Sequence, residues 1–385
     1  MQRRYDLDWV RSIVVVSIIF FHSLIIFINR ESAIYYVKSG VNSMLCEYLE
    51  AFIGRFHMTI LFFIAGITAR YSFARRGVKG FIKNRTLKLL IPGMLVIIFL
   101  NPIDSYLYAT SHGSILTYWE NYLLFFTRFS DGLAGTTPGF SPMHIWFLIY
   151  LFVFSMILIP LFIKGQCKAM DNIFKAIANF FYKPYMLLLV MLPFPLIFLI
   201  DILGEMNPIA YLYIFVCGYI FATSELYQKA VDRDKWGYII ASIFLMAFYL
   251  IGVFRVDYKQ YSPILPGILV YITKLLRILP VFAIIGAAHS WIPNKKSSVL
   301  TYLNQSNFFV YLIHTAVLGC VGYLIIFVFN MRNLFGFIMI NLVSYMICFG
   351  LYEVYQKVAK IVTRWSISYG DEISIKQGRI DESLK

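Results

Sequence analysis

Long apolar runs recur along the chain, and each is close to the length that a helix needs to cross a lipid bilayer. A transmembrane helix takes about 20 mostly apolar residues, and the sequence contains about ten such runs. Within them, polar and apolar residues do not alternate as they do in the strands of a membrane barrel. We therefore expect an all-α fold, that of a polytopic integral membrane protein with about ten transmembrane helices. The runs lie at 12–29, 50–70, 87–107, 144–163, 185–201, 207–224, 236–254, 267–290, 308–329 and 334–356.

The composition and the placement of charge agree with this fold class. Hydrophobic residues form 60% of the chain and charged residues 14%, whereas soluble domains average about 45–50% apolar and about 25% charged residues. The formal net charge is +14, but most basic residues lie in short connections such as 74–88, as expected of cytoplasmic loops. We therefore expect no nucleic-acid partner, and a multi-pass protein of the cell (inner) membrane with both termini in the cytoplasm. Residues 1–360 would form the membrane domain and 361–385 a polar cytoplasmic tail.

The first apolar run has Arg11 at its entrance and His22, a residue that is costly to place in a membrane, halfway along it. At about 100° per residue they return to nearly the same face of a helix, roughly 16 Å apart along its axis. Asp8, one turn before Arg11, is placed to hold its guanidinium group. Ionisable residues inside a membrane usually serve function, although a flanking arginine and a histidine that packs between helices would explain this pair equally well.

Further polar residues occur near the outer ends of two other runs. Arg55 and His57 begin the second run, and His57 is expected at a depth similar to that of His22. His144 and Trp146 begin the fourth run, where tryptophan alone would suit an interfacial aromatic belt. The three histidines together are harder to explain by packing and indicate a functional site.

Two basic pairs have a spacing of three residues, which places both side chains on one face of a helix. Arg85 and Lys88 begin the third run at its expected inner end. They either mark a cytoplasmic flank or bind phosphate groups. Lys274 and Arg277 lie in the eighth run, where they would neutralise an anionic substrate or extend to the interface.

Several common kinds of catalytic site are absent from the sequence. The chain has no G-x-x-x-x-G-K-[ST] loop for a nucleotide and no G-x-S-x-G motif for a serine nucleophile. It also has no H-E-x-x-H motif, so we expect no metal site. Its five cysteines show neither paired nor metal-ligand spacing, and we expect them to be reduced.

Four segments, in order, resemble signatures of the membrane acyltransferase 3 family. They are "DWVRSIVVVSIIFFH" (8–22), "FHMTILFFIAG" (56–66), "HIWFL" (144–148) and "NFFVYLIH" (307–314). Within the family, the chain looks most similar to the glucan-biosynthesis protein C (glucan succinyltransferase) branch. The resemblance covers about residues 4–356.

The resemblance implies an O-acyltransferase, an enzyme that transfers groups other than aminoacyl groups. It would move an acetyl or succinyl group from cytoplasmic acyl-CoA to a hydroxyl of an extracytoplasmic carbohydrate, with His22 as the general base. Acyl-CoA would be a donor substrate, and no cofactor would be bound permanently. The other partners would be the carbohydrate acceptor, the lipid bilayer and proteins that assemble cell-envelope polysaccharides.

Site residues follow from the matching positions and from the polar residues described above. Lys88 stands where the family has arginine, and lysine keeps the charge but lacks the planar two-pronged guanidinium group. Arg55 or His57 would stabilise the oxyanion. The expected catalytic residues are His22, Arg11 and Asp8; those for the donor are Arg11, Arg85 and Lys88; those for the substrate are Arg55, His57, His144, Trp146 and His314.

Other functions and substrates stay open at the level of the sequence. A polytopic transporter or exporter of a sugar or polysaccharide, without acyl transfer, would also need buried charges. A non-catalytic scaffold for polysaccharide assembly would leave the buried histidines without a role. Periplasmic glucan, capsule, lipopolysaccharide and exported polysaccharide all fit as acceptors, and Lys274 with Arg277 would favour a dicarboxylic donor such as succinyl-CoA.

Overall fold

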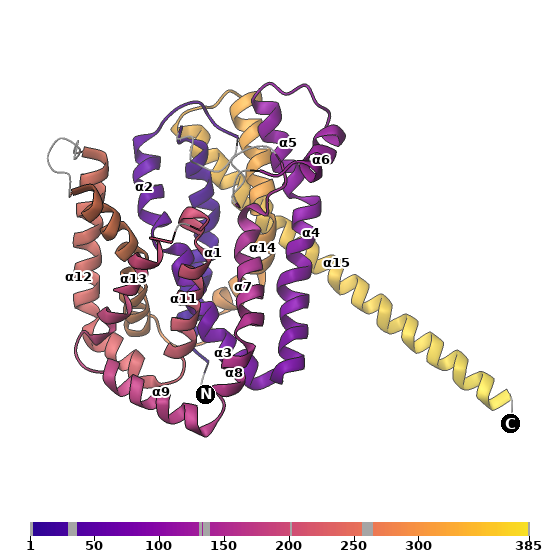
Figure 1. Cartoon of the computed structure of the whole chain (residues 1–385). Helices are drawn as coiled ribbons and strands as arrows, with labels where there is room; N and C mark the ends of the chain where they lie inside the picture. Colours follow the sequence, from indigo (N-terminus) through magenta and orange to yellow (C-terminus); the bar gives the residue numbers. More distant parts are fainter. Residues whose placement is uncertain are drawn as a thin grey trace.

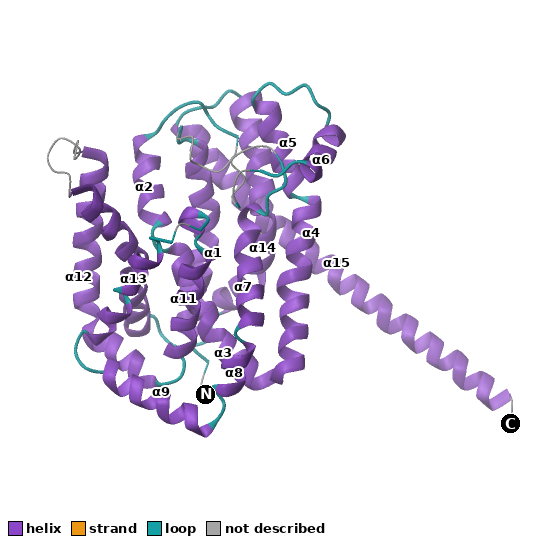
Figure 2. Cartoon of the chain, in the orientation of Figure 1, coloured by secondary structure: helices purple, strands orange, loops and turns teal. Residues whose placement is uncertain are grey.

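The fold is helical throughout the described part of the chain. The computed structural model describes residues 3–29, 37–130, 133, 139–200, 202–255 and 265–383, in which an isolated bridge between Phe129 and Phe140 is the one β-type pairing. Figures 1 and 2 show upright helices packed side by side, with the last helix leaving the bundle at an angle. The expected all-α fold class is therefore confirmed.

Fifteen α-helices are joined by short 3₁₀ and π segments. The α-helices are α1 (Tyr5–Ile26), α2 (Met44–Gly54), α3 (His57–Arg85), α4 (Ile91–Phe99), α5 (Asn101–Ser111), α6 (Tyr118–Thr127), α7 (Trp146–Ile157), α8 (Ile159–Lys164), α9 (Lys168–Phe181), α10 (Pro193–Ile197), α11 (Pro208–Phe221), α12 (Glu225–Arg255), α13 (Leu265–Trp291), α14 (Ser298–Tyr323) and α15 (Leu334–Ser383). The short segments are η1 (Thr86–Leu90), η2 (Met143–Ile145), η3 (Met186–Val190), η4 (Gly204–Met206) and η6 (Leu324–Val328).

The number of membrane-crossing helices depends on how the long and bent helices are divided. Within the described residues, six helices are long and apolar enough to cross a bilayer, and a seventh is added if the bent pair Lys168–Phe181 and Met186–Ile197 is one span. The expected count of ten is thus not confirmed. Two of the expected spans, 50–70 and 87–107, fall in the single helical run Met44–Ser111 of 68 residues. Others are short in the structure, since α7 has 12 residues and α11 has 14.

The run Met44–Ser111 does not continue in one direction. At 1.5 Å per residue it would be about 100 Å long, about three times the thickness of the hydrocarbon core. Gly77 interrupts α3 with φ 65° and ψ −179°, a conformation that glycine adopts without steric cost. Figure 1 shows α4 as a separate upright limb of the bundle. The single helical run Met44–Ser111 therefore contains the residues of two expected spans.

Helices α3 and α11 cross at close range. A Cβ atom on Gly66 would overlap the carbonyl oxygen of Phe215, and a Cβ atom on Gly218 would overlap that of Phe63. Two glycines thus face each other's backbones, as small residues do where membrane helices pack closely. This crossing holds the start of α3, and with it His57, against the centre of the bundle.

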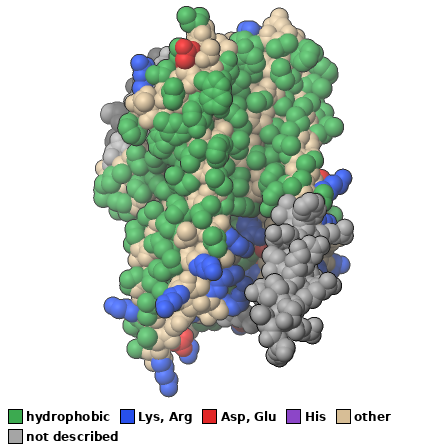
Figure 3. Space-filling view, turned by 90° about the vertical axis from the view of Figure 1, so that its right-hand side faces the viewer, with side chains coloured by type: hydrophobic (Ala, Val, Ile, Leu, Met, Phe, Trp, Pro, Cys, Tyr) green, Lys and Arg blue, Asp and Glu red, His purple; other side chains and the backbone are tan. Residues whose placement is uncertain are grey.

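The outer surface of the bundle is largely apolar. Ile243 and Phe244 on α12 are 65% and 68% exposed, and Met346 on α15 is 74% exposed. Figure 3 shows one face covered over most of its height by apolar side chains, with Lys and Arg gathered toward the lower end. Soluble monomers rarely expose continuous apolar surfaces of this extent. With its long apolar helices, the chain has the features of a multi-pass membrane protein.

Two surface features lie at the ends of the bundle. Thr117 and Glu120 form a reciprocal capping box at the start of α6, and hydrogen bonds from the Thr117 backbone and side chain lower the pKa of Glu120. At the other extreme, α15 continues to Ser383, so that most of the expected polar tail 361–385 belongs to this helix. Residues 384 and 385 lie outside the described part of the chain.

Candidate functional site

Three histidines from distant parts of the sequence meet inside the bundle. The ring of His314, on α14, lies 5.1 Å from that of His22 on α1 and 4.8 Å from that of His144 on η2, measured between centroids. His57, at the start of α3, joins them through Phe21, whose ring lies 4.5 Å from its own. All four histidines are at least nine-tenths buried. We call His22, His57, His144 and His314 the histidine cluster.

The position of His144 depends on a tightly held turn. Pro142 precedes the single 3₁₀ turn η2, and Met143 takes a positive φ of 46°. Asn101 donates a hydrogen bond to the carbonyl oxygen of Ser141 at 3.0 Å, and the Ser141 hydroxyl accepts one from the Met143 amide at 3.1 Å. These bonds fix the backbone just before His144.

Backbone carbonyl groups determine the tautomer of two histidine rings in the cluster. Nδ1 of His314 lies 2.7 Å from the carbonyl oxygen of Tyr311, and Nδ1 of His57 lies 3.0 Å from that of Ile53. A carbonyl oxygen only accepts, so we infer that each Nδ1 carries the hydrogen and that each neutral ring keeps a lone pair on Nε2. Nε2 of His314 is buried and has no hydrogen-bond partner among the described residues. This atom is therefore prepared to accept a proton.

A buried carboxyl group stands behind His144. Nδ1 of His144 lies 3.2 Å from the hydroxyl of Thr315. Asp104, on α5, is close to Thr315, and its two carboxyl oxygens are buried without a hydrogen-bond partner among the described residues. Asp104 is 3% exposed and forms no ion pair within the described residues. Gly319 makes room for it, because a Cβ atom there would lie 2.5 Å from Oδ1 of Asp104. Asp104, Thr315 and His144 thus form a line that ends at the histidine cluster.

Arg11 and His22 both contact α14. The Arg11 guanidinium donates to Oδ1 of Asn304 at 2.6 Å and to Oδ1 of Asp8 at 3.3 Å. The ion pair with Asp8 is the one expected from their spacing. One helix pair, α1 with α14, therefore connects a basic group near the start of α1 with the histidine cluster, about 16 Å further along.

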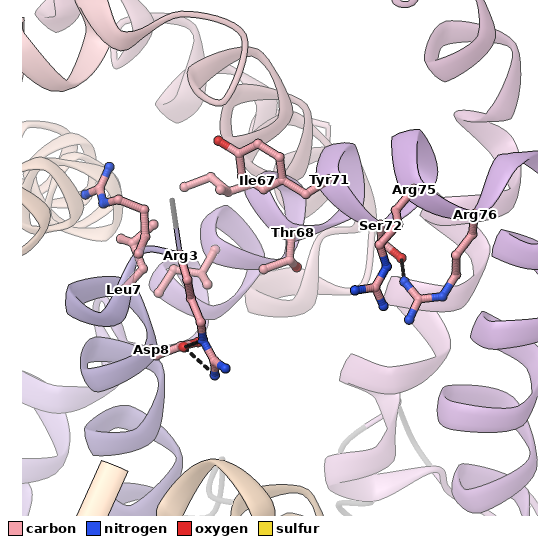
Figure 4. A pocket seen from close by; sticks show the side chains of 11 residues that line it. Arg3, Leu7, Asp8, Ile67, Thr68, Tyr71, Ser72, Arg75 and Arg76 are labelled. Atoms are coloured by element: carbon pink, nitrogen blue, oxygen red, sulfur yellow. Dashed lines mark hydrogen bonds and ion pairs between the residues drawn. The ribbon is translucent and has the colours of Figure 1, made fainter. Parts of the chain in front are cut away.

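A cavity of about 670 Å³ opens beside the start of α1. Figure 4 shows Arg3, which precedes α1, and Asp8 of α1 on one side of it, and Ser72, Arg75 and Arg76 of α3 on the other. Arg3 pairs with Asp8 at 2.8 Å. We call this cavity the arginine pocket; it is lined by Arg3, Arg4, Leu7, Asp8, Ile64, Ile67, Thr68, Tyr71, Ser72, Arg75 and Arg76.

The basic charge of the arginine pocket exceeds its acidic charge. The charge of Arg4 is neutralised by an ion pair with Asp6 at 2.5 Å. Arg76 donates a hydrogen bond to the hydroxyl of Ser72 at 3.0 Å. Arg75 forms no ion pair in the described part of the chain. The arrangement suits a ligand with several negative charges, such as a polyphosphate.

The structure separates Arg85 from Lys88. Arg85 ends α3 with its guanidinium over the ring of Phe81 at 4.9 Å, and it is close enough to Arg76 for their charges to interact. Lys88 lies in the π segment η1 and is exposed. A π-helix has more residues per turn than an α-helix, so a spacing of three no longer aligns two side chains. Neither Arg85 nor Lys88 lines the arginine pocket, but the charge of Arg85 acts on Arg76, which does.

A second group of basic residues lies around Glu205. Arg277 contacts Glu205 through a short ion pair and donates to the hydroxyl of Tyr211 at 3.1 Å. Lys274 pairs with Glu205 at 2.8 Å, and Arg55 lies over the ring of Tyr249 at 5.2 Å. We call Arg55, Lys274 and Arg277 the cationic cluster.

Trp146 connects the two groups of residues. Its ring lies 5.2 Å from that of Tyr211, which bonds Arg277, and it follows His144 by two positions. The structure thus brings all four expected histidines together, with Trp146 and Arg55 nearby, and places Arg11 and Asp8 at the arginine pocket.

Sequence reasoning missed Asp104, Thr315, Glu205 and most of the arginine pocket. Asp104 had a signal, because a single acidic residue in the apolar run 87–107 is costly unless it serves a purpose. Arg75 and Arg76 were read as cytoplasmic charge, and nothing in their spacing shows that they line a cavity with α1. Within the described residues no group of His, Cys, Asp or Glu is arranged to hold a metal ion.

Comparison with known proteins gives one match. The family model of the acyltransferase 3 group, described as an acyltransferase domain, matches residues 4–352. Neither a curated protein nor a solved structure matches the chain.

Proposed function

The chain belongs to the acyltransferase 3 family and is an acyltransferase, and from this premise we propose that it acylates a carbohydrate across a membrane. An acetyl or succinyl group would pass from acyl-CoA on the cytoplasmic side to a sugar hydroxyl on the outer side. The arginine pocket and both termini would face the cytoplasm of a cell with an inner membrane. Membership of the glucan-biosynthesis branch would make a periplasmic glucan the acceptor.

The arginine pocket supports binding of the donor. Coenzyme A carries several phosphate groups, and Arg3, Arg75 and Arg76 present guanidinium groups that bind phosphate in a bidentate way. Arg11 holds Asp8 in the wall of the pocket, and Arg85 adds charge next to Arg76. Acyl-CoA would thus lie with its phosphates in the pocket and its thin pantetheine arm along α1, toward the histidine cluster.

The histidine cluster supports the chemistry. The sugar oxygen attacks the thioester carbonyl carbon while His22 accepts the hydroxyl proton. The tetrahedral intermediate then collapses, the carbon–sulfur bond breaks, and the imidazolium returns the proton to the departing thiolate. General-base catalysis of this kind contributes about 10²–10⁴-fold to a rate.

The neighbouring rings have supporting roles in this proposal. Nε2 of His314 stabilises the proton near His22, and the line from Asp104 through Thr315 keeps His144 oriented. His57 does not suit the expected role of oxyanion donor, because its Nδ1 hydrogen is bonded to Ile53 and its neutral Nε2 has none. Arg55 lies with the other cations, where a permanent negative charge fits better than a transient oxyanion.

The observation that carries the proposal is the meeting of His22, His144 and His314 further along α1, the helix whose start lines the arginine pocket. The test uses the full chain in lipid nanodiscs, with acetyl-CoA or succinyl-CoA and a glucan, and follows CoA release. We expect acceptor-dependent release that His22→Ala abolishes while donor binding persists. His112→Ala, an exposed histidine outside the cluster, is the matched control and should behave as wild type. A wild-type protein that binds no CoA would contradict the proposal.

A further inference from the structure

The cationic cluster contains more positive charge than the contacts around it neutralise. Glu205 is the carboxylate that contacts both Lys274 and Arg277. Arg55 forms no ion pair and no hydrogen bond among the described residues. Its charge and that of Arg277 are close enough to interact, and like charges repel. Among the described residues, no carboxylate pairs with Arg55, and Arg277 shares Glu205 with Lys274.

These side chains do not reach out to solvent. Arg277 is 5% exposed, and the side chain of Lys274 is 12% exposed, whereas that of Glu205 is 60% exposed. Both cations lie over the ring of Phe198, Lys274 at 4.1 Å and Arg277 at 5.5 Å. Extension to the membrane interface would leave the charged groups exposed, so it does not explain this arrangement.

Unused hydrogen-bond donors are buried in the same place. Nε of Arg55 and Nε of Arg277 are both buried without a partner in the described residues. A buried guanidinium N–H that lacks an acceptor costs free energy unless a ligand supplies one. Two such N–H groups, one in the turn after α2 and one on α13, therefore indicate a ligand that accepts hydrogen bonds, as an anion does.

The cluster lies next to the reacting groups. The charges of Arg277 and Arg55 both act on His57, whose ring contacts Phe21 beside His22. On the other side, Tyr211 and Trp146 connect Arg277 to the segment that carries His144. A group held by the two arginines would thus lie next to the histidine cluster.

We propose that Arg55 and Arg277 form a subsite that binds a carboxylate group of one of the two substrates. The subsite rests on the proposed function only for its role, because binding of the anion needs no acyl transfer. A carboxylate matches the planar guanidinium with two parallel hydrogen bonds. It comes either from the free end of a dicarboxylic acyl chain, as in succinyl-CoA, or from an acidic sugar in the acceptor.

Binding of small probes to the full chain in nanodiscs tests the subsite directly. Monomethyl succinate represents the acyl chain, with neutral dimethyl succinate as its control; methyl glucuronide represents the acceptor, with methyl glucoside as its control. Tryptophan fluorescence is a suitable readout, because Trp146 contacts the tyrosine that bonds Arg277. We expect one of the two anions, and neither neutral probe, to give a saturable change.

Three variants show whether the arginines are responsible. Arg55→Gln should weaken binding of the anion about ten- to hundredfold, the value of a hydrogen bond to a charged group. Arg277→Gln is combined with Glu205→Gln, so that no carboxylate loses its partner, and should have a similar effect. Arg70→Gln is the matched control, since Arg70 lies over Tyr219 at 5.4 Å far along α3 from Arg55, and it should bind as wild type.

The outcomes show which substrate supplies the carboxylate, and they test the subsite independently of the acyl-transfer reaction. Binding of monomethyl succinate identifies the acyl chain, and binding of methyl glucuronide identifies the acceptor. Equal binding of anionic and neutral probes, or wild-type affinity in folded Arg55→Gln, would overturn the subsite. CoA release from succinyl-CoA and from butyryl-CoA, measured on the same samples, tests the reaction separately: anion binding without release would overturn the reaction and leave the subsite.

Discussion

The imidazole rings of His22 and His314 lie 5.1 Å apart, although they come from the first and one of the last helices of the bundle. Nδ1 of His314 is bonded to a backbone carbonyl, so its free nitrogen is an acceptor in the neutral ring. Two bases side by side share a proton more readily than they hold two. The pair therefore suits a reaction in which one proton is taken from an alcohol and later returned to a thiolate.

Replacing His22 by alanine should lower kcat about 10²–10⁴-fold, because the general base is lost. The acyl-CoA dissociation constant should stay within about twofold, since the arginine pocket lies some 20 Å away along α1. For the wild type, the rate should fall as the pH is lowered, because a protonated imidazole cannot accept the hydroxyl proton. Stopped-flow or steady-state CoA release across a pH series measures both effects. A His22→Ala enzyme with wild-type kcat would assign the base to another residue.

Asp104→Asn should reduce kcat about ten- to hundredfold with little change in the KM of either substrate, because the carboxyl group orients His144 through Thr315. Thr315→Val should have a similar effect, and Thr315→Ser, which keeps the hydroxyl group, should recover most of the activity. Recovery by serine separates orientation of His144 from a general loss of packing. If valine and serine behave alike at position 315, the line to Asp104 has no role in turnover.

Arg75→Ala and Arg76→Ala should raise the KM for acyl-CoA about tenfold each while kcat changes little, because they remove contacts that are the same in the ground and transition states. Higher salt should weaken donor binding in the wild type and less so in the variants. Lys88→Ala should have a smaller effect than either, since Lys88 is exposed outside the pocket. A larger effect of Lys88→Ala would restore the donor site expected from the sequence.

Gly218→Ala should destabilise the protein by about 1–3 kcal/mol or prevent its folding, because the added methyl group overlaps the backbone of Phe63. The midpoint of thermal unfolding in detergent measures the change. Gly350→Ala on α15, where a Cβ atom meets nothing within 4 Å, is the control and should be neutral or slightly stabilising. Equal midpoints for the two variants would show that the helices separate easily.

The sequence was sufficient for the parts of the fold and site that depend on one helix at a time. Apolar runs predicted the helical class, and the spacing of Asp8, Arg11 and His22 predicted an ion pair and a shared face. Contacts between helices were not predictable in this way. The neighbours of His22 lie on α14 and η2, and one spacing rule cannot show which distant segment packs against which.

The count of ten spans is not confirmed, for a related reason. Hydropathy marks apolar residues but does not show where a helix turns, and Gly77 and the bent pair after Lys168 divide the chain differently from the apolar runs. The donor-binding role of Arg85 and Lys88 stays a prediction, and the π segment η1, which changes the number of residues per turn between them, could not be read from their spacing. Asp104 was recognisable as a buried charge, but its partner Thr315 was not.

The crossing of Gly66 and Gly218 also limits how the protein can move. A displacement of α3 along α11 by one residue would bring side chains into the space that the two glycines leave for the facing backbones. Carriers that alternate between inward and outward states need two halves that rock against each other, and this crossing locks two central helices together. Turnover would then proceed in a nearly stationary scaffold, in which the acyl group travels between substrates while the helices keep their places.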